Sequence, residues 1–367
     1  MNIQKKLENI IYKEGKLFGA TGLSFTIQSP LLNKGKPQTY NVGLQSLEGS
    51  PVTNDSLFQI GSASKTFLSV VMLQLESEEK ISLEDPVSKF FPNNYPLWHE
   101  IKIKHLLNMT SGIPNFTNDG TEISIKNIHN LDLEISADEI LNSIQNNSLL
   151  FTTGSYFYYS NTNYVLAKKI IEHVTQNTLS HEISKRIIEK LNLKNTFYIN
   201  HLPKNEIHIN KHNHIMNGYN YYDKEFLGKE TINNSLSVAS GPGSLVSNSS
   251  NLNTFIRSLF SEDNHLLLSP FQIKQMLNFN FYEKEIDSSI TMPQKITDHF
   301  IEDGYGLGIY TNSLNEFSHS GMTDGFLSEM KYLKETNTSY VYLMNASNEK
   351  QEKELISVIE ELLALLH

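Results

Sequence analysis

Ser62 and Lys65, three residues apart, could together perform nucleophilic catalysis. A serine hydroxyl is a poor nucleophile at its ordinary pKa and needs a neighbouring base. On a helix, side chains three residues apart share one face, so the amine could reach the hydroxyl. The first turn of such a helix also offers free N–H groups and positive potential to a developing negative charge. Gly61, directly before the serine, would let a substrate approach the backbone closely.

The pattern Ser-x-x-Lys is short, and its plain alternative is a helix start with a solvated lysine. Tyr159 and Asn161 supply a second candidate pair. A tyrosine near a lysine can have its pKa lowered enough to exchange protons with a serine, and an asparagine amide can orient a substrate carbonyl or the lysine. Two similar triplets begin at Tyr198 and Tyr310, but they lie on strand-like runs and are interpreted as structural. Tyr159 follows a glycine–serine turn and opens a helical run, which favours a position facing a cleft.

A third candidate is the only His-x-Gly triplet of the chain, formed by His319, Ser320 and Gly321. On a strand edge it would present a hydroxyl and a backbone N–H, and the glycine would let a substrate lie against the strand. The alternative for His319 alone is a hydrogen-bonded, semi-buried histidine.

The elements that must position these residues follow from hydrophobic periodicity. A helix is expected over residues 62–79, because residues 67–75 form an apolar run. Alternating residues 23–27 predict a half-buried strand, and residues 39–47 predict a second one. Amphipathic helices are expected near both ends of the chain, and the last third contains four short strand-like runs: residues 305–310, 316–320, 326–333 and 339–345. Residues 334–338 suit a hairpin loop between the last two.

In the middle of the chain, apolar residues recur at helical spacing, and polar loops separate these runs. We therefore expect an α+β fold in which an antiparallel sheet is flanked by helices. The predicted sheet domain is discontinuous, with residues 1–82 and 235–367, and a mostly helical domain with a loop-rich end, residues 83–234, is inserted into it. Residues 200–234 within that insertion are polar and are expected to form a loop.

Six segments resemble, in the same order, class C β-lactamases and the related D-alanyl-D-alanine carboxypeptidases. They are residues 58–67 (FQIGSASKTF), 106–113 (LLNMTSGI), 158–163 (YYSNTN), 239–246 (ASGPGSLV), 305–308 (YGLG) and 319–326 (HSGMTDGF). The resemblance covers roughly residues 20–345, and the order and spacing of its segments are far more specific than any one triplet.

This resemblance implies a β-lactamase/transpeptidase-like fold with the active site between the sheet and the helical domain. It implies that Ser62 forms an acyl-enzyme and that Lys65 and Tyr159 share the acid–base work, with the general base left open between them. The backbone N–H groups of Ser62 and Met322 would hold the oxyanion. In the same family pattern Asn161 and Ser320 would position the substrate. His319 would stand where many relatives have lysine.

Two departures from the family pattern concern the substrate. Close relatives carry an arginine and a threonine, as partners for a substrate carboxylate, where this chain has Tyr310 and Met322. Thr311 or Thr323 could take over that role. The first hypothesis is therefore a penicillin-binding serine hydrolase of D-alanyl peptides. A carboxylesterase or other small-amide hydrolase is the second, and a non-catalytic penicillin- or peptidoglycan-binding module is the third.

Composition excludes several other classes. The formal net charge of −10 argues against nucleic acid or anionic membrane as a partner. The absence of cysteine removes thiol catalysis, disulfides and thiolate metal sites. No nucleotide-binding loop or Gly-x-Ser-x-Gly elbow is present, and the expected mechanism needs no cofactor and no metal. Substrates are expected to be small peptides, β-lactams or esters, and the sequence indicates no particular oligomeric state.

Two further features carry weaker expectations. His201, His208, His212 and His214 are interpreted as a solvated loop, with metal binding at His208 and His212 as the alternative. The family resemblance favours a periplasmic or secreted protein. The N-terminus shows no apolar signal-peptide stretch and no apolar run is long enough to span a membrane, so a cytoplasmic location is the alternative.

Overall fold

A computed structural model describes most of the chain. The described residues are 2–13, 16–17, 19–118, 120–129, 133–199, 215–221, 227–231, 235–237, 239, 241–261, 266–282, 293–297 and 303–366. Most of the polar stretch 200–234, with its four histidines, lies outside them.

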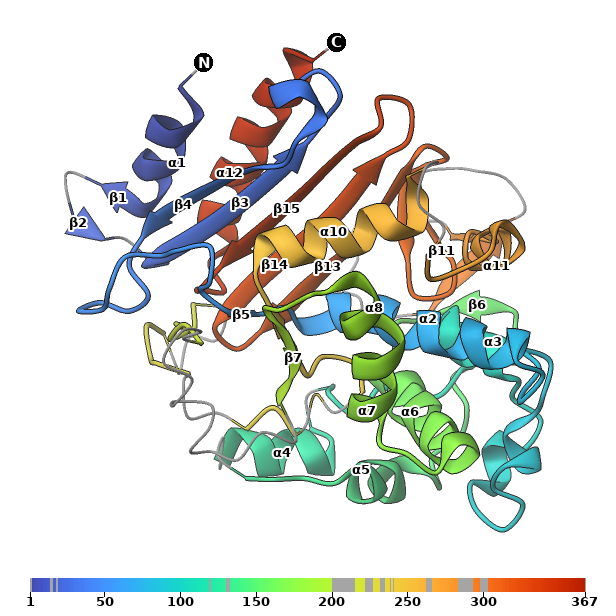
Figure 1. Cartoon of the computed structure of the whole chain (residues 1–367). Helices are drawn as coiled ribbons and strands as arrows, with labels where there is room; N and C mark the ends of the chain where they lie inside the picture. The colour runs from blue at the N-terminus through green and yellow to red at the C-terminus, as the bar shows by residue number, and fades with distance from the viewer. Residues whose placement is uncertain are drawn as a thin grey trace.

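A ten-stranded antiparallel sheet forms the centre of the molecule (Figure 1). Its strand order is β4-β3-β15-β14-β13-β12-β11-β9-β10-β6. The bounds are β3 Gly22–Gln28, β4 Gln38–Gly43, β6 Tyr156–Phe157, β9 Asn280–Tyr282, β10 Gln294–Thr297, β11 Asp303–Tyr305, β12 Tyr310–Ser313, β13 Glu316–Thr323, β14 Phe326–Leu333 and β15 Thr338–Met344. A second sheet has the order β5-β8-β7, with β5 Phe58–Gln59, β7 Thr196–Tyr198 and β8 Leu245–Ser247, and β1 Tyr12–Lys13 pairs with β2 Lys16–Leu17.

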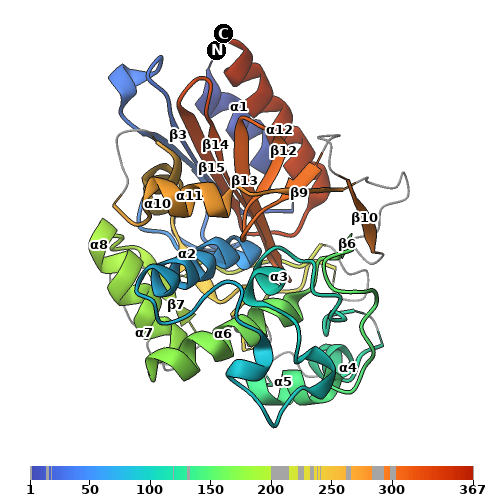
Figure 2. The ribbon, with the colours of Figure 1, turned by 90° about the vertical axis from the view of Figure 1, so that its right-hand side faces the viewer.

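Helices cover both faces of the large sheet. On one face the terminal helices lie side by side (Figure 2), and their Leu7, Leu355 and Ile359 pack against alternate residues of β3 and β15. On the other face α10 packs against β3, β14 and β15. The bounds are α1 Ile3–Ile11, α2 Ser64–Ser77, α3 Ile103–Leu107, α4 Glu122–His129, α5 Ala137–Ile144, α6 Asn161–Thr175, α7 Leu179–Ile183, α8 Glu189–Leu191, α10 Ser249–Phe260, α11 Pro270–Met276 and α12 Glu349–Ala364. The expected fold class, an antiparallel sheet flanked by helices, is confirmed.

The half-buried strand expected at residues 23–27 is wrong in one respect, because β3 is buried on both faces. Its apolar residues face α1 and α12, as the alternation predicted. Its polar residues Ser24 and Thr26 are also buried, because the hydroxyl of Ser249 on α10 lies 2.7 Å and 2.6 Å from theirs. Small hydroxyl side chains thus pair with one another beneath a helix that the sequence pattern of the strand does not reveal.

The single strand expected at residues 305–310 is also wrong. The chain turns between β11 and β12, where Gly306 N–H donates to Ile309 O at 2.9 Å. Gly308 has φ +71, and a side chain there would press on Ser69 and Tyr164 of the neighbouring helices. Thr66 Oγ1 donates to Gly308 O at 2.7 Å, so this turn is fixed against α2.

The predicted division at residues 82/83 and 234/235 stays a prediction. One buried hydrophobic cluster joins the two parts, since it contains Trp98 and Ile140 of the insertion together with Phe326 and Val341 of the sheet. Strand β6, which comes from the insertion, pairs with β10 at the edge of the large sheet.

Candidate active site

The nucleophile segment runs from β5 through a short 3-10 turn, Gly61–Ala63, into α2. β5 pairs with β8, and Ile60 N–H donates to Leu245 O at 3.1 Å. Gly61 has φ +49, a left-handed conformation that glycine adopts without strain. Twelve consecutive residues of α2, from Ser64 to Leu75, are buried, because the helix lies between the sheet and the other helices (Figure 2). A rigid, enclosed element therefore presents Ser62 at its start.

Ser62, Lys65 and Tyr159 are brought together. Lys65 Nζ donates a hydrogen bond to Ser62 Oγ at 2.7 Å, and it also contacts Pro242 O at 3.3 Å. The Tyr159 hydroxyl hydrogen-bonds with Ser62. Its ring centroid lies 4.8 Å from Lys65 Nζ. A serine with a lysine and a tyrosine within reach is an arrangement that can activate a hydroxyl for attack on a carbonyl.

Burial controls the protonation of Lys65. The residue is 0% exposed, and no carboxylate in the described part of the chain forms an ion pair with it. Taking an ammonium out of water disfavours its charged form, so the pKa of Lys65 lies well below its ordinary value. The neutral amine, which can accept a proton, is therefore available at lower pH than in a solvated lysine.

Tyr159 departs from the sequence-based expectation of a lowered pKa. Burial raises the pKa of its hydroxyl, and the hydrogen bond with Ser62 offsets only part of that effect. A neutralised lysine also offers little positive charge to stabilise a tyrosinate. The tyrosine therefore keeps its proton in the resting site and can donate it.

The turn that carries Ser62 packs against β13. A Cβ on Gly61 would lie 2.8 Å from Met322 N, so a side chain there would clash. Thr323 pairs with Phe326 across a two-residue turn, and antiparallel pairs alternate, so the N–H of Met322 points away from β14. That N–H lies beside the start of α2, where an oxyanion formed at Ser62 would develop.

Asn161 lies at the first position of α6. Its N–H donates to Asn115 Oδ1 at 3.0 Å, and its side-chain amide donates to Thr117 Oγ1 at 3.2 Å. These bonds hold the residue at the pocket wall. Tyr198, whose triplet was interpreted as structural, accepts a hydrogen bond from Gly241 N–H at 3.0 Å.

His319 is buried, at 1% exposure, beneath the site. Its Nδ1 lies 2.7 Å from Ser320 O and must carry the proton, because a carbonyl only accepts. Nε2 is then the acceptor for the Tyr305 hydroxyl, 3.1 Å away. Burial, helped by the charge of Lys65, lowers the pKa of His319 to about 3. His319 is thus a neutral imidazole, while Ser320 is exposed.

A cavity of about 270 Å³ opens at Ser62. Five separate chain segments line it, and the lining residues are Gln59, Gly61, Ser62, Phe116, Thr117, Ile123, Ser124, Asn161, Thr231, Ser235, Leu236, Ala239, Pro242, Gly243, Met322, Thr323 and Asp324. Lys65, Tyr159 and His319 are not among them, so they lie behind the serine rather than on the cavity wall.

Several lining residues escaped the motif analysis. Phe116, Ile123, Thr231 and Asp324 belong to no catalytic triplet, although Asp324 lies inside a segment that carries the family resemblance. The tyrosines around the lysine were also missed: the Tyr164 ring centroid lies 5.7 Å from Lys65 Nζ. Their only sequence signal was high aromatic content near the motifs, which does not show where rings converge.

Thr311 and Thr323 are the two residues that could bind a substrate carboxylate in place of the missing arginine and threonine. Thr311 is buried and donates its hydroxyl to Ser313 O. The ring of Tyr310 stacks on that of Tyr159, with centroids 6.4 Å apart, and lies edge-on to His319 at 5.2 Å. Thr323 is the one of these residues that reaches the cavity.

Membrane and metal features were searched over the same described residues. No helix there is both long and apolar enough to span a bilayer. No group of three or more histidine, aspartate or glutamate side chains there is arranged to hold a metal ion.

Comparison with known proteins gives a consistent picture. The sequence model of the Beta-lactamase family matches residues 31–364. Protein flp of Staphylococcus aureus (strain MW2) is 30% identical over 202 residues, which are 53% of this chain and 38% of that protein. Penicillin-binding protein 4* of Bacillus subtilis (strain 168) is 24% identical over 330 residues, 86% of this chain and 67% of that protein.

A D-stereospecific amidohydrolase from Streptomyces sp. has a similar solved structure. The TM-score is 0.74 at 23% identity, and the match covers 98% of this chain and 96% of that one. This likeness shows a shared fold over the whole chain. The match with protein flp, in contrast, spans well under half of that relative's length.

Proposed function

The chain belongs to the Beta-lactamase family of serine hydrolases, and from that premise we propose that it hydrolyses small amides of D-configured acyl residues through an acyl-enzyme on Ser62. The observation that carries this proposal is the 2.7 Å hydrogen bond between Ser62 Oγ and a fully buried Lys65. A lysine that is buried without a carboxylate partner is costly unless its neutral form is used.

In the proposed reaction Ser62 Oγ attacks the substrate carbonyl carbon and its proton passes to Lys65 Nζ. The lowered pKa of Lys65 makes it the base, and the raised pKa of Tyr159 makes it the proton donor. The tetrahedral oxyanion lies between the N–H groups of Ser62 and Met322. When the bond to the leaving nitrogen breaks, that nitrogen takes the proton from Lys65 by way of the Tyr159 hydroxyl. Water then attacks the acyl carbon, releases the acid and restores Ser62.

The charge of the site favours a leaving group without a carboxylate. Carboxypeptidase action on D-alanyl-D-alanine peptides, the first hypothesis from the sequence, requires a partner for the terminal carboxylate. Among the described residues that line the cavity there is no arginine or lysine, and His319 is neutral. The one charged residue among the described residues of the lining is an acid, Asp324. Amides and esters with a neutral leaving group fit this cavity better.

The D configuration of the acyl residue is the finer part of the proposal. It is supported by the family resemblance to enzymes of D-alanyl peptides and by the whole-chain likeness to a D-stereospecific amidohydrolase.

The test combines labelling and turnover. The protein is incubated briefly with an uncharged p-nitrophenyl ester, and its intact mass is measured beside Ser62→Ala and Ser155→Ala. Ser155 is exposed and lies outside the cavity, so it is a matched control. We expect one acyl adduct in the wild type and in Ser155→Ala and none in Ser62→Ala.

Turnover is then compared among D-phenylalanine amide, L-phenylalanine amide and a D-Ala-D-Ala peptide. Preference for the D-amide supports the proposal. Faster turnover of the D-Ala-D-Ala peptide would replace it with the carboxypeptidase hypothesis. Turnover of esters alone would replace it with the esterase, and the absence of both adduct and turnover would leave a binding module.

A further inference from the structure

Met109 has an unusual backbone conformation just after α3. Its φ is +61, a left-handed conformation in which a long side chain is strained. Thr110 N–H donates to His105 O at 3.0 Å, and Met109 N–H lies 3.5 Å from Leu106 O. This is a helix end at which the left-handed residue is usually glycine. Because a methionine stands there instead, the surroundings must hold it in place, and such strain is concentrated at functional sites.

The segment that carries Tyr159 binds Met109 through both its backbone and its side chain. Tyr158 N–H donates to Met109 O at 2.9 Å. Ser160 N–H donates to Met109 Sδ at 3.4 Å, and the side-chain amide of Asn163 donates to the same sulfur at 3.4 Å. One residue thus accepts hydrogen bonds from the peptide N–H groups on both sides of Tyr159.

These hydrogen bonds are shielded from water. Met109, Ser160 and Asn163 are each 0% exposed. Asn163 Oδ1 accepts a hydrogen bond from Ser111 Oγ at 2.6 Å, which orients the amide with its N–H groups toward the sulfur. A thioether is a weak acceptor, but a buried N–H without any partner is costly. Loss of the sulfur would therefore favour a shift of the chain at Ser160.

The position of the Tyr159 hydroxyl depends on this part of the chain. The hydroxyl hydrogen-bonds with Ser62, whose Oγ becomes bonded to the acyl carbon during the proposed reaction. When the leaving group departs, the hydroxyl must point at the leaving atom instead. A displacement of about 1 Å between reacting groups can reduce a rate about 100-fold. A backbone shift beside Tyr159 is therefore expected to slow the step in which the leaving atom takes its proton.

We propose that Met109 is the positioning residue of Tyr159, and that its sulfur and its carbonyl hold the tyrosine so that the hydroxyl can deliver a proton to the leaving atom. The inference rests on the proposed function, in which the leaving nitrogen takes the Tyr159 proton and the hydroxyl regains one from Lys65. Met109 is absent from the cavity lining, so it acts through Tyr159 and not on the substrate.

The leaving group separates this role from a general structural one. The nitrogen of an anilide must take a proton as its bond to the acyl carbon breaks, whereas p-nitrophenolate leaves as a stable anion and needs none. Loss of the sulfur should accordingly slow the hydrolysis of an anilide more than that of a p-nitrophenyl ester. A substitution that merely loosens the packing should slow both.

The test compares the p-nitroanilide and the p-nitrophenyl ester of one acyl group, N-acetyl-D-phenylalanine. The readout is the ratio of kcat/KM for the anilide to that for the ester. Met109→Leu keeps the size of the side chain and the backbone carbonyl but removes the acceptor, and Met109→Gln supplies an amide oxygen in its place. Tyr159→Phe removes the proton donor itself and serves as the reference.

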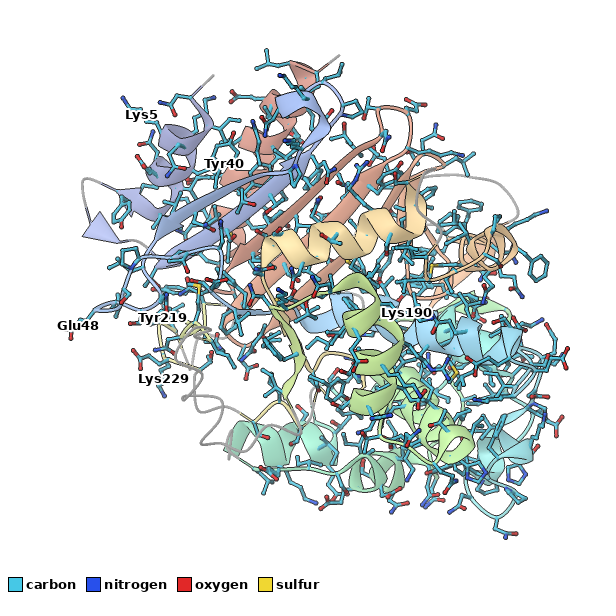
Figure 3. All side chains as sticks on the ribbon, viewed as in Figure 1. Lys5, Tyr40, Glu48, Lys190, Tyr219 and Lys229 are labelled. Atoms are coloured by element: carbon cyan, nitrogen blue, oxygen red, sulfur yellow. The ribbon has the colours of Figure 1, made fainter. Side chains whose placement is uncertain are left out.

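Two controls accompany these variants. Met344→Leu makes the same exchange at a buried methionine of β15, in the cluster beneath α1 and α12. Glu48→Gln changes an exposed residue at the edge of the molecule (Figure 3), outside the cavity lining. Both should leave the ratio unchanged.

We expect Tyr159→Phe to lower the ratio and Met109→Leu to lower it about tenfold, as for a displacement of less than 1 Å. Met109→Gln should keep a higher ratio than Met109→Leu. An unchanged ratio in Met109→Leu, or equal slowing of both substrates, overturns this inference alone if Tyr159→Phe lowers the ratio. An unchanged ratio in Tyr159→Phe, or hydrolysis of the ester alone by the wild type, overturns the proposed function on which the inference rests.

Discussion

Replacing Gly321 by alanine tests whether the contact between β13 and the start of α2 builds the oxyanion site. A Cβ at this position would lie 2.6 Å from Ser328 Oγ and 2.9 Å from the carbonyl carbon of Ile60, and closer still to the carbonyl oxygen. An ordinary contact between carbon and oxygen begins at about 3.3 Å, so the two backbones must separate by roughly 1 Å. Ser328 Oγ donates to Ile60 O at 2.8 Å, and the separation would disturb this hydrogen bond as well.

The expected cost in the free energy of unfolding is about 1–3 kcal/mol, the usual range for an overpacked site. The effect on the reaction should be larger, because Ile60 lies two residues before the nucleophile and Gly321 directly before Met322. A displacement of about 1 Å between catalytic groups can reduce a rate about 100-fold. We therefore expect Gly321→Ala to fold and to acylate Ser62 about 100 times more slowly.

The assay is burst-phase release of p-nitrophenol from an aryl ester, with urea unfolding measured on the same samples. Gly35→Ala is the matched control, because Gly35 has φ +78 with nothing within 4 Å of an added Cβ. Its strain should cost roughly 1–2 kcal/mol and leave acylation unchanged. If Gly321→Ala loses stability to the same degree as Gly35→Ala but acylates at the wild-type rate, the contact between β13 and α2 is not what positions the oxyanion site.

Three further predictions follow from burial. The acylation rate of Ser62 should rise with pH through a pKa well below the ordinary value of lysine, about 10.4. Lys65→Arg, whose guanidinium cannot lose its proton, should abolish acylation. A rate that rises only through the ordinary lysine pKa would contradict the assignment of Lys65 as the base. His319 should cause no inflection in the same profile between about pH 5 and 8, because burial holds its pKa at about 3, and imidazole NMR shifts that titrate near 6.5 would show otherwise. Burial raises the pKa of Glu329 on β14, so its favourable contribution to stability is present below its unfolded pKa and is lost as pH rises through the folded value. Glu329→Gln should accordingly raise Tm near neutral pH and leave it unchanged near pH 4, and a Tm gain of equal size at both pH values would refute this cause.

Much of the architecture follows from local sequence pattern. The strand at Phe326–Leu333 has the bounds that its residue types predict, and α1 and α12 lie where helical periodicity places them. Residue types and spacing also singled out Ser62, Lys65 and Tyr159 as candidate reacting groups, and the family resemblance implied that they share one site. The sequence predicts these helices and strands because they depend on residues only a few positions apart, the range over which periodicity and motif spacing are informative.

Tertiary structure alone decided the protonation and the shape of the site. The pKa of Lys65 depends on its complete removal from water, and its contact with Pro242 O bridges 177 residues of sequence. The neutral state of His319, a residue of β13, depends on its burial and on the charge of Lys65 from a distant segment. The cavity lining brings together Thr231 and Asp324, which no motif connects. Desolvation and convergence of distant segments are properties of the packed molecule, and therefore a sequence read by itself can name the reacting groups but not their charge or the ligand that they enclose.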